Sequence, residues 1–213
     1  MTFLLLTLSA CADGPTPVAI PRTPFEGESR LGAIHQITFG GENAEAYWSF
    51  DETHLVFQST RPPYHADQIF TMRADGSEVN LVSTGKGRTT CSYFLPGDKR
   101  ILYASTHAAG DEPPAPPDRS KGYVWPIYDS YEIYVADADG KNPVNLTKSP
   151  GYDAEATVSP VGDRIVFTST RDGDIALYSM QLDGGDVKQL TDRPGYGGGA
   201  CSWWDGRRVV WRA

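Results

Sequence analysis

The chain has 213 residues, of which 39% are hydrophobic and 11% aromatic, and it carries a formal net charge of −8. This length can build one sizeable core or two small ones, and the many glycines, prolines and aromatic residues suit a turn-rich all-β protein rather than a disordered chain or a helical bundle. The acidic balance argues against nucleic acid as a partner and against a polybasic patch for a membrane surface.

The N-terminal segment predicts export. Residues 1–11, "MTFLLLTLSAC", form an apolar run that is too short to span a bilayer and that ends in small residues, as a secretory signal does. The stretch from Leu8 to Cys11 resembles the lipobox of bacterial lipoproteins, which implies that Cys11 is lipidated and becomes the mature N-terminus. An ordinary cleaved signal with a coincidental cysteine is the alternative. Residues 12–30 are rich in proline and polar side chains, so we predict a tether outside the fold.

One β-strand recurs along the rest of the chain. The stretches "THLVFQSTR", "KRILYASTH", "DRIVFTSTR" and "RRVVWRA" share an alternating apolar core, and three of them continue into Ser-Thr. Their aromatic positions follow one another at steps of 46, 64 and 44 residues: Phe57, Tyr103, Phe167 and Trp211. In three of these units a further strand ends in Asp-Gly, a hairpin signal, at residues 75–76, 139–140 and 183–184. With a first and a fourth strand in each complete unit, this pattern predicts an all-β β-propeller of four-stranded antiparallel blades.

Residues 146–196, "LTKSPGYDAEATVSPVGDRIVFTSTRDGDIALYSMQLDGGDVKQLTDRPGY", carry a more specific signal. They resemble the WD-type repeat of TolB-like propellers, and the resemblance extends over residues 31–213. The turn before the second strand departs from the family pattern, because it reads "SFDE", "LPGD" and "SPVGD". The predicted parts are a strand of a closing blade at 31–39, blade one at 40–83, blade two at 84–147 with an insertion at 107–130, blade three at 148–191 and half a blade at 192–213.

The blade number leaves two interpretations open. TolB-like rings have six or seven blades, so the resemblance implies a ring that is truncated at its C-terminus. The alternative is a four-bladed ring in which residues 31–39 close the last blade. If the truncated chain occurs alone, the strand edge at Val209–Arg212 is unpaired, and we then expect edge-to-edge pairing with a second copy of the chain.

Cys91 and Cys201 open the similar stretches "CSYF" and "CSWW". Two cysteines in an exported protein can form a disulfide. Equivalent positions in different blades would hold them far apart, so we expect two buried free thiols instead.

Catalytic and metal-binding signatures do not stand out. The sequence has no G-x-S-x-G, no Walker A, no H-E-x-x-H and no paired C-x-x-C motif. We therefore predict no catalytic residues, no metal and no cofactor in this chain.

Two regions are candidate binding surfaces. "NAEA" at 43–46 and "DAEA" at 153–156 lead into the innermost strands of blades one and three, which border the central channel of a propeller. The candidate channel-mouth residues are Asn43, Glu45, Arg61, His107, Asp153, Glu155 and Arg171. Alternatively, the acids cap turns or pair with Arg88.

The second region is the insertion at 107–130. Its proline-rich half is stiff, and Tyr123, Trp125 and Tyr128 are large anchors suited to recognition. The alternative is that these rings fold back and cover the edge of the blade.

The TolB-like resemblance implies a periplasmic protein that docks partners in the bacterial envelope. We predict a non-catalytic propeller, lipid-anchored in the periplasm at the outer membrane, that binds a protein partner or a small ligand and meets the membrane through its anchor only. One alternative is the gating propeller of a prolyl-oligopeptidase-type hydrolase whose catalytic domain is not in this chain. Another is a carbohydrate-binding or lyase-type propeller.

Overall fold

The computed structural model describes residues 19–212. The predicted signal segment and the lipidation site at Cys11 lie outside these residues. No helix in the described part is long and apolar enough to cross a membrane.

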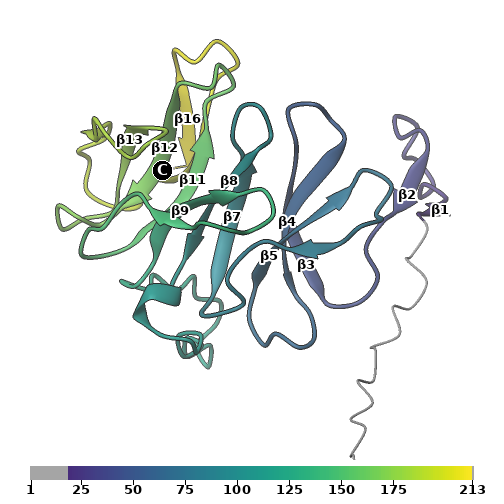
Figure 1. Cartoon of the computed structure of the whole chain (residues 1–213), viewed down its shortest axis with the longest axis horizontal. Helices are drawn as coiled ribbons and strands as arrows, with labels where there is room; N and C mark the ends of the chain where they lie inside the picture. Colours follow the sequence, from purple (N-terminus) through teal and green to yellow (C-terminus); the bar gives the residue numbers. More distant parts are fainter. Residues whose placement is uncertain (1–18, 213) are drawn as a thin grey trace, which may run out of the picture.

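Three four-stranded antiparallel sheets follow one another along the chain as blades (Figure 1). Blade one contains β3 (Glu42–Trp48), β4 (His54–Thr60), β5 (Gln68–Arg73) and β6 (Asn80–Leu81). Blade two contains β7 (Thr89–Phe94), β8 (Arg100–Ser105), β9 (Glu132–Asp137) and β10 (Val144–Asn145), with a short 3-10 helix at His107–Ala109. Blade three contains β11 (Asp153–Val158), β12 (Arg164–Ser169), β13 (Ala176–Gln181) and β14 (Lys188–Gln189). The pair β15 (Gly198–Ser202) and β16 (Val209–Arg212) comes last. The predicted all-β architecture of antiparallel blades is confirmed.

The first strands of the blades lie side by side. Strand β7 contacts both β3 and β11, and β11 in turn contacts β15. The core therefore lies between blades, where the repeated apolar alternation of the second strands is buried. Ile101 and Tyr103 belong to one apolar cluster with Val56 of blade one, whereas Leu102 belongs to another with Phe167 of blade three.

The Asp-Gly turns also join neighbouring blades. Gly76, Gly140 and Gly184 adopt positive φ angles of 84°, 83° and 87°. A Cβ atom at these positions would lie 2.7 to 2.8 Å from a carbonyl oxygen of the preceding unit, at Ile37, Val82 and Leu146 respectively. The glycine thus permits both the turn and the close approach of two backbones.

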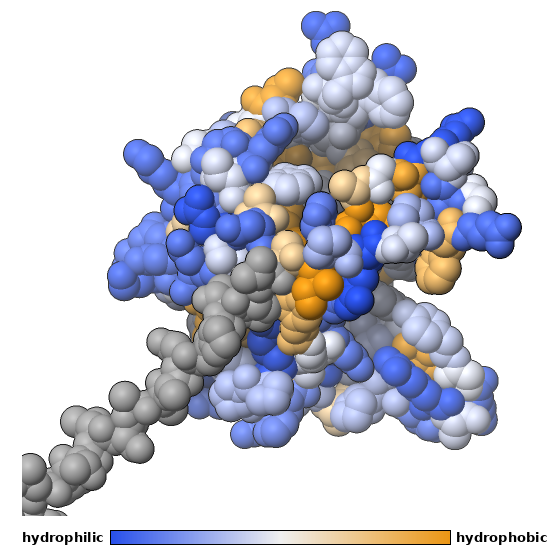
Figure 2. Space-filling view, turned by 90° about the vertical axis from the view of Figure 1, so that its right-hand side faces the viewer, coloured by the Kyte–Doolittle hydropathy of each residue, from blue (hydrophilic) through white to orange (hydrophobic). Residues whose placement is uncertain are grey.

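The first strand pair differs from the prediction. Strand β1 (Ile20–Arg22) lies within the stretch that we expected to be a tether, and it pairs with β2 (Ile34–Gln36). Pro21 is compatible with this strand because β1 is an edge strand, in which a missing backbone N–H is tolerated. Just after β2, Ile37 packs on the apolar cluster of blade one. Figure 2 looks onto this end of the molecule and shows apolar side chains among polar ones.

Candidate functional site

Every first strand carries a bulge at the same position. The register shifts once in each pairing of a first with a second strand. The bulge residues are Glu45, Cys91, Glu155 and Gly199, with φ angles of 50°, 47°, 53° and 58°. A bulge bends the strand, re-aims a side chain and leaves an N–H without a ladder partner. At each of these four positions the side chain therefore points in a different direction from that of a residue in a regular strand.

The bulges correct the predicted equivalence of the two cysteines. Cys91 is a bulge residue, whereas Cys201 pairs with Val210 and therefore corresponds to Tyr93, which pairs with Leu102. Both thiols are free, as expected, but neither is fully buried. Cys91 is half-buried, and Cys201 is exposed because it stands outside the interblade core. Burial raises the pKa of the Cys91 thiol to about 12, and the carboxylates of Glu45 and Glu155 add to the effect. The Cys91 thiol is therefore protonated at physiological pH.

Side chains from one blade satisfy the free N–H groups of the next. The Oε1 atom of Gln58 accepts a hydrogen bond from the Cys91 backbone N–H at 3.2 Å and another from the Thr90 hydroxyl at 3.0 Å. The Oε2 atom of Glu155 accepts the Gly199 N–H at 2.9 Å. The bulges thus become contacts between blades. Sequence reasoning missed Gln58, although its signal is visible: a long polar residue stands where blade two has Ala104.

Glu155 and Glu45 differ sharply despite their equivalent positions. Glu155 is 8% exposed, and its carboxylate also accepts hydrogen bonds from the Thr168 hydroxyl at 2.8 Å and the Tyr196 hydroxyl at 3.1 Å. Glu45 is exposed and accepts a bond from the Tyr47 hydroxyl at 2.5 Å. Glu155 therefore fastens β15 to blade three, while Glu45 remains open to solvent.

We expect Glu155→Ala to lower the free energy of unfolding by about 2 kcal/mol, since it leaves the buried Thr168 hydroxyl without its acceptor and removes the bonds to Tyr196 and Gly199. Glu45→Ala is the matched control and should change stability by less than about 0.5 kcal/mol, as surface substitutions usually do. Urea unfolding followed by fluorescence measures both. Equal losses in the two variants would contradict the structural role of Glu155.

The arginines that follow Ser-Thr form the same cluster in two blades. Arg61 donates to the Asn43 Oδ1 atom at 2.8 Å and lies over the rings of Phe57 and Phe70, at 5.3 and 4.9 Å from their centroids. In blade three, Arg171 donates to Asp153 Oδ1 at 2.9 Å and lies 5.1 Å from the ring centroids of both Phe167 and Tyr178.

Blade two replaces the arginine with histidine. The His107 ring lies 4.3 Å from the Tyr134 ring, and its Nδ1 atom is 2.8 Å from the Ser105 hydroxyl. Burial lowers the pKa of His107, with a smaller contribution from Lys86. Blade two therefore has a neutral imidazole ring at the position where blades one and three have a guanidinium group.

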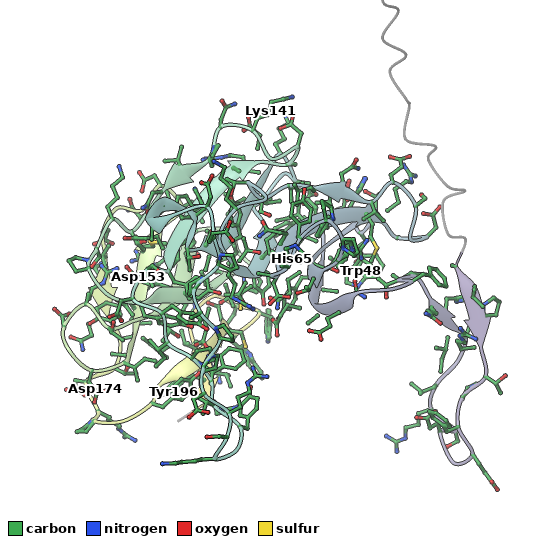
Figure 3. All side chains as sticks on the ribbon, turned by 90° about the horizontal axis from the view of Figure 1, so that it is seen from below. Trp48, His65, Lys141, Asp153, Asp174 and Tyr196 are labelled. Atoms are coloured by element: carbon green, nitrogen blue, oxygen red, sulfur yellow. The ribbon has the colours of Figure 1, made fainter. Side chains whose placement is uncertain are left out.

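The predicted channel-mouth residues are thus divided among separate contacts: Arg61 and Arg171 bond within their own blades, whereas Glu155 bonds across to the β15 segment. Arg88 pairs with Asp67 at 3.0 Å rather than with the acids of the first strands. In Figure 3, His65 and Trp48 lie with blade one, whereas Asp153 and Tyr196 lie on the opposite side. Within residues 19–212, no group of three or more His, Cys, Asp or Glu side chains is arranged to hold a metal ion.

The insertion covers a cavity beside the first strands of blades one and two. We call this the insertion cavity; its volume is about 220 Å³. Its aromatic walls are Tyr123, Trp125, Tyr128, Tyr131 and Tyr152, and its polar lining includes Glu42, Gln58, Asp67, Arg88 and Arg119. A second cavity of about 520 Å³ adjoins it and shares part of this lining. The structure therefore brings the predicted insertion aromatics together with residues that the sequence analysis did not select.

No protein-family model matches the chain. A stretch of 57 residues is 44% identical to the Tol-Pal system protein TolB of Bordetella pertussis, and it covers 26% of this chain and 13% of that protein. The solved structure of a putative TolB from Agrobacterium tumefaciens superposes with a TM-score of 0.64 at 19% identity, over 84% of this chain and 57% of that one. TolB from Acinetobacter baumannii gives a TM-score of 0.65 at 19% identity, over 92% of this chain and 44% of that one. The chain thus spans about half the length of these solved structures and a much smaller share of the curated relative.

Proposed function

Because the chain is a TolB-like β-propeller, we propose that it is a non-catalytic scaffold that binds a protein partner in the bacterial envelope. The observation that carries the proposal is the exposure of the insertion. The side chains of Tyr123 and Trp125 are 77% and 55% exposed, and Val124 and Ile127 are 40% and 44% exposed. Clustered apolar surface of this kind marks an interaction site, and Tyr and Trp dominate binding energy at interfaces.

The insertion is held in place rather than loose. The Tyr128 hydroxyl donates to the Ala115 carbonyl at 2.9 Å, and the Arg119 guanidinium lies 6.0 Å from the Tyr123 ring centroid. The Tyr128 ring also packs beside the Tyr131 ring, with 6.1 Å between their centroids. Binding of a partner here loses less conformational entropy than binding to a mobile loop, because the insertion is already ordered.

The relatives support a proposal for the partner and the location. The Bordetella protein is named for the Tol-Pal system, so we propose an envelope protein of that system as the partner and the periplasm as the location. The lipobox-like stretch supports an anchor at Cys11. In a cell fractionation, Cys11→Ser should move the protein from the membrane to the soluble periplasmic fraction, and retention on the membrane would rule out this anchor.

Photocrosslinking in cells tests the docking surface. A photoreactive residue in place of Trp125 should form a specific adduct with one Tol-Pal protein, identified by mass spectrometry. The control is the same residue in place of Val161, which is 56% exposed in the turn between β11 and β12. The proposal fails if position 125 gives no protein adduct or gives the same adducts as position 161.

A further inference from the structure

We infer that the insertion cavity binds an uncharged sugar ring, a function beyond that of the protein scaffold. The inference rests on the combination of aromatic walls, balanced charge and polar groups that are free to bond. Each of these features narrows the class of ligand.

The charged groups of the cavity balance. Two carboxylates, Glu42 and Asp67, stand against two guanidinium groups, Arg88 and Arg119. Asp67 and Arg88 are already joined at 3.0 Å. A cationic or anionic ligand would therefore meet as much repulsion as attraction, whereas a neutral ligand that both donates and accepts hydrogen bonds can use both signs.

Polar groups remain free at the cavity. The Gln58 side chain uses its Oε1 atom for the next blade, so its NH₂ group is left for a ligand. In the part of the chain that the structure describes, neither this NH₂ nor the Tyr131 hydroxyl has a protein partner. Burial raises the pKa of Tyr131 above its usual value, so its hydroxyl stays protonated and can donate. The hydroxyl groups of a sugar ring can accept hydrogen bonds from this NH₂ group and can both donate to and accept from the Tyr131 hydroxyl.

The aromatic walls of the cavity suit the apolar face of a sugar ring. Its C–H groups are apolar and pack against aromatic rings, and here Tyr123 and Trp125 present exposed rings over a buried floor that includes Tyr152, which is 2% exposed. A proline-rich peptide is the competing class of ligand, because such peptides also dock on aromatic side chains. The volume of about 220 Å³ gives room for one compact ring.

Titration of the full chain with defined probes tests the inference. The neutral probes are maltotriose and N,N′-diacetylchitobiose, the anionic probe is trigalacturonate, and a proline-rich peptide represents the other class. Calorimetry and tryptophan fluorescence should show saturable binding of at least one neutral probe, with weaker binding of trigalacturonate. Trp125→Ala and Tyr123→Ala should each weaken that binding about tenfold, the effect of one aromatic contact.

Trp204→Ala is the matched control, because Trp204 is 74% exposed and lies away from the cavity lining. This variant should bind the neutral probe as the unchanged chain does. Thermal unfolding of all three variants checks that the fold is retained. The inference is overturned if neither neutral probe binds, if binding survives both cavity substitutions, or if the peptide binds and neutral probes do not compete with it.

Discussion

Arg171→Ala should lower the free energy of unfolding by about 3–5 kcal/mol, the loss expected when one partner of a buried ion pair is removed. The side chain of Asp153 is 1% exposed and that of Arg171 is 17% exposed. The Oδ2 atom of Asp153 is buried without a partner among the described residues, so Arg171 is its charge partner through Oδ1 alone. Removing the guanidinium leaves a carboxylate in a site that water does not reach. Chemical unfolding in urea measures the loss.

Blade one supplies the control for this prediction. Arg61 occupies the same position as Arg171 and lies over the same kind of aromatic pair, but its partner Asn43 is neutral. Arg61→Ala therefore removes a hydrogen bond and packing without stranding a charge, and should cost about 1–2 kcal/mol. Equal losses in the two variants would show that charge burial at Asp153 is unimportant.

The pH dependence of the Arg171→Ala deficit follows from the same burial. Burial raises the pKa of Asp153 above the usual value of 3.8 for an aspartate, against the lowering effects of Ser169 and Arg171. Loss of Arg171 removes one of those opposing effects. Because the folded-state pKa is the higher one, the folded form binds the proton more tightly than the unfolded chain, and stability falls as pH rises from 3.8 through the folded value. The deficit should be largest at neutral pH and should shrink in acid, and Asp153→Asn in the same background should remove this dependence.

The sequence predicted the blades because their signals are local. Alternating apolar strands, Ser-Thr and Asp-Gly recur in each unit, and each is fixed by the conformation of a few neighbouring residues. The candidate site was harder to predict because its contacts run across the sheet and between blades. Asp153 was expected to face the channel or Arg88, yet its partner is Arg171, which lies in the turn just after the next strand of its own blade.

The bulges explain the other differences. An extra residue shifts the register without a clear mark in the sequence, so "CSYF" and "CSWW" aligned by letter while their cysteines occupy different positions. The same shift gives Glu155 and Glu45 one backbone position but different surroundings, because Tyr196 and Thr168 reach only Glu155. Such neighbours come from distant parts of the chain, and one sequence alone does not reveal them.

Gly140→Ala should be more destabilising than the same change at a comparable glycine elsewhere, by about 1–3 kcal/mol, the cost of forcing extra atoms into a packed site. At Gly140 the φ angle is 83°, and a Cβ atom would lie 2.7 Å from the Val82 carbonyl oxygen and 2.9 Å from the Val82 Cα. Both atoms belong to a backbone that cannot rotate away. Val82 follows blade one and Gly140 belongs to blade two, so relief of the clash must move one blade relative to the other.

Gly97→Ala is the control variant, because it has the cost of the left-handed turn conformation without the contact between blades. Gly97 has nearly the same φ angle, 86°, but nothing lies within 4 Å of the place where its Cβ would be. Its substitution should cost only the left-handed conformation, about 1–2 kcal/mol. Urea unfolding of the two variants gives the difference directly. If the two losses were equal, the Asp-Gly turn would act only within its own hairpin; a larger loss at Gly140 would show that the turn also sets the spacing of adjacent blades, which is why a short hairpin signal recurs with the period of the whole repeat.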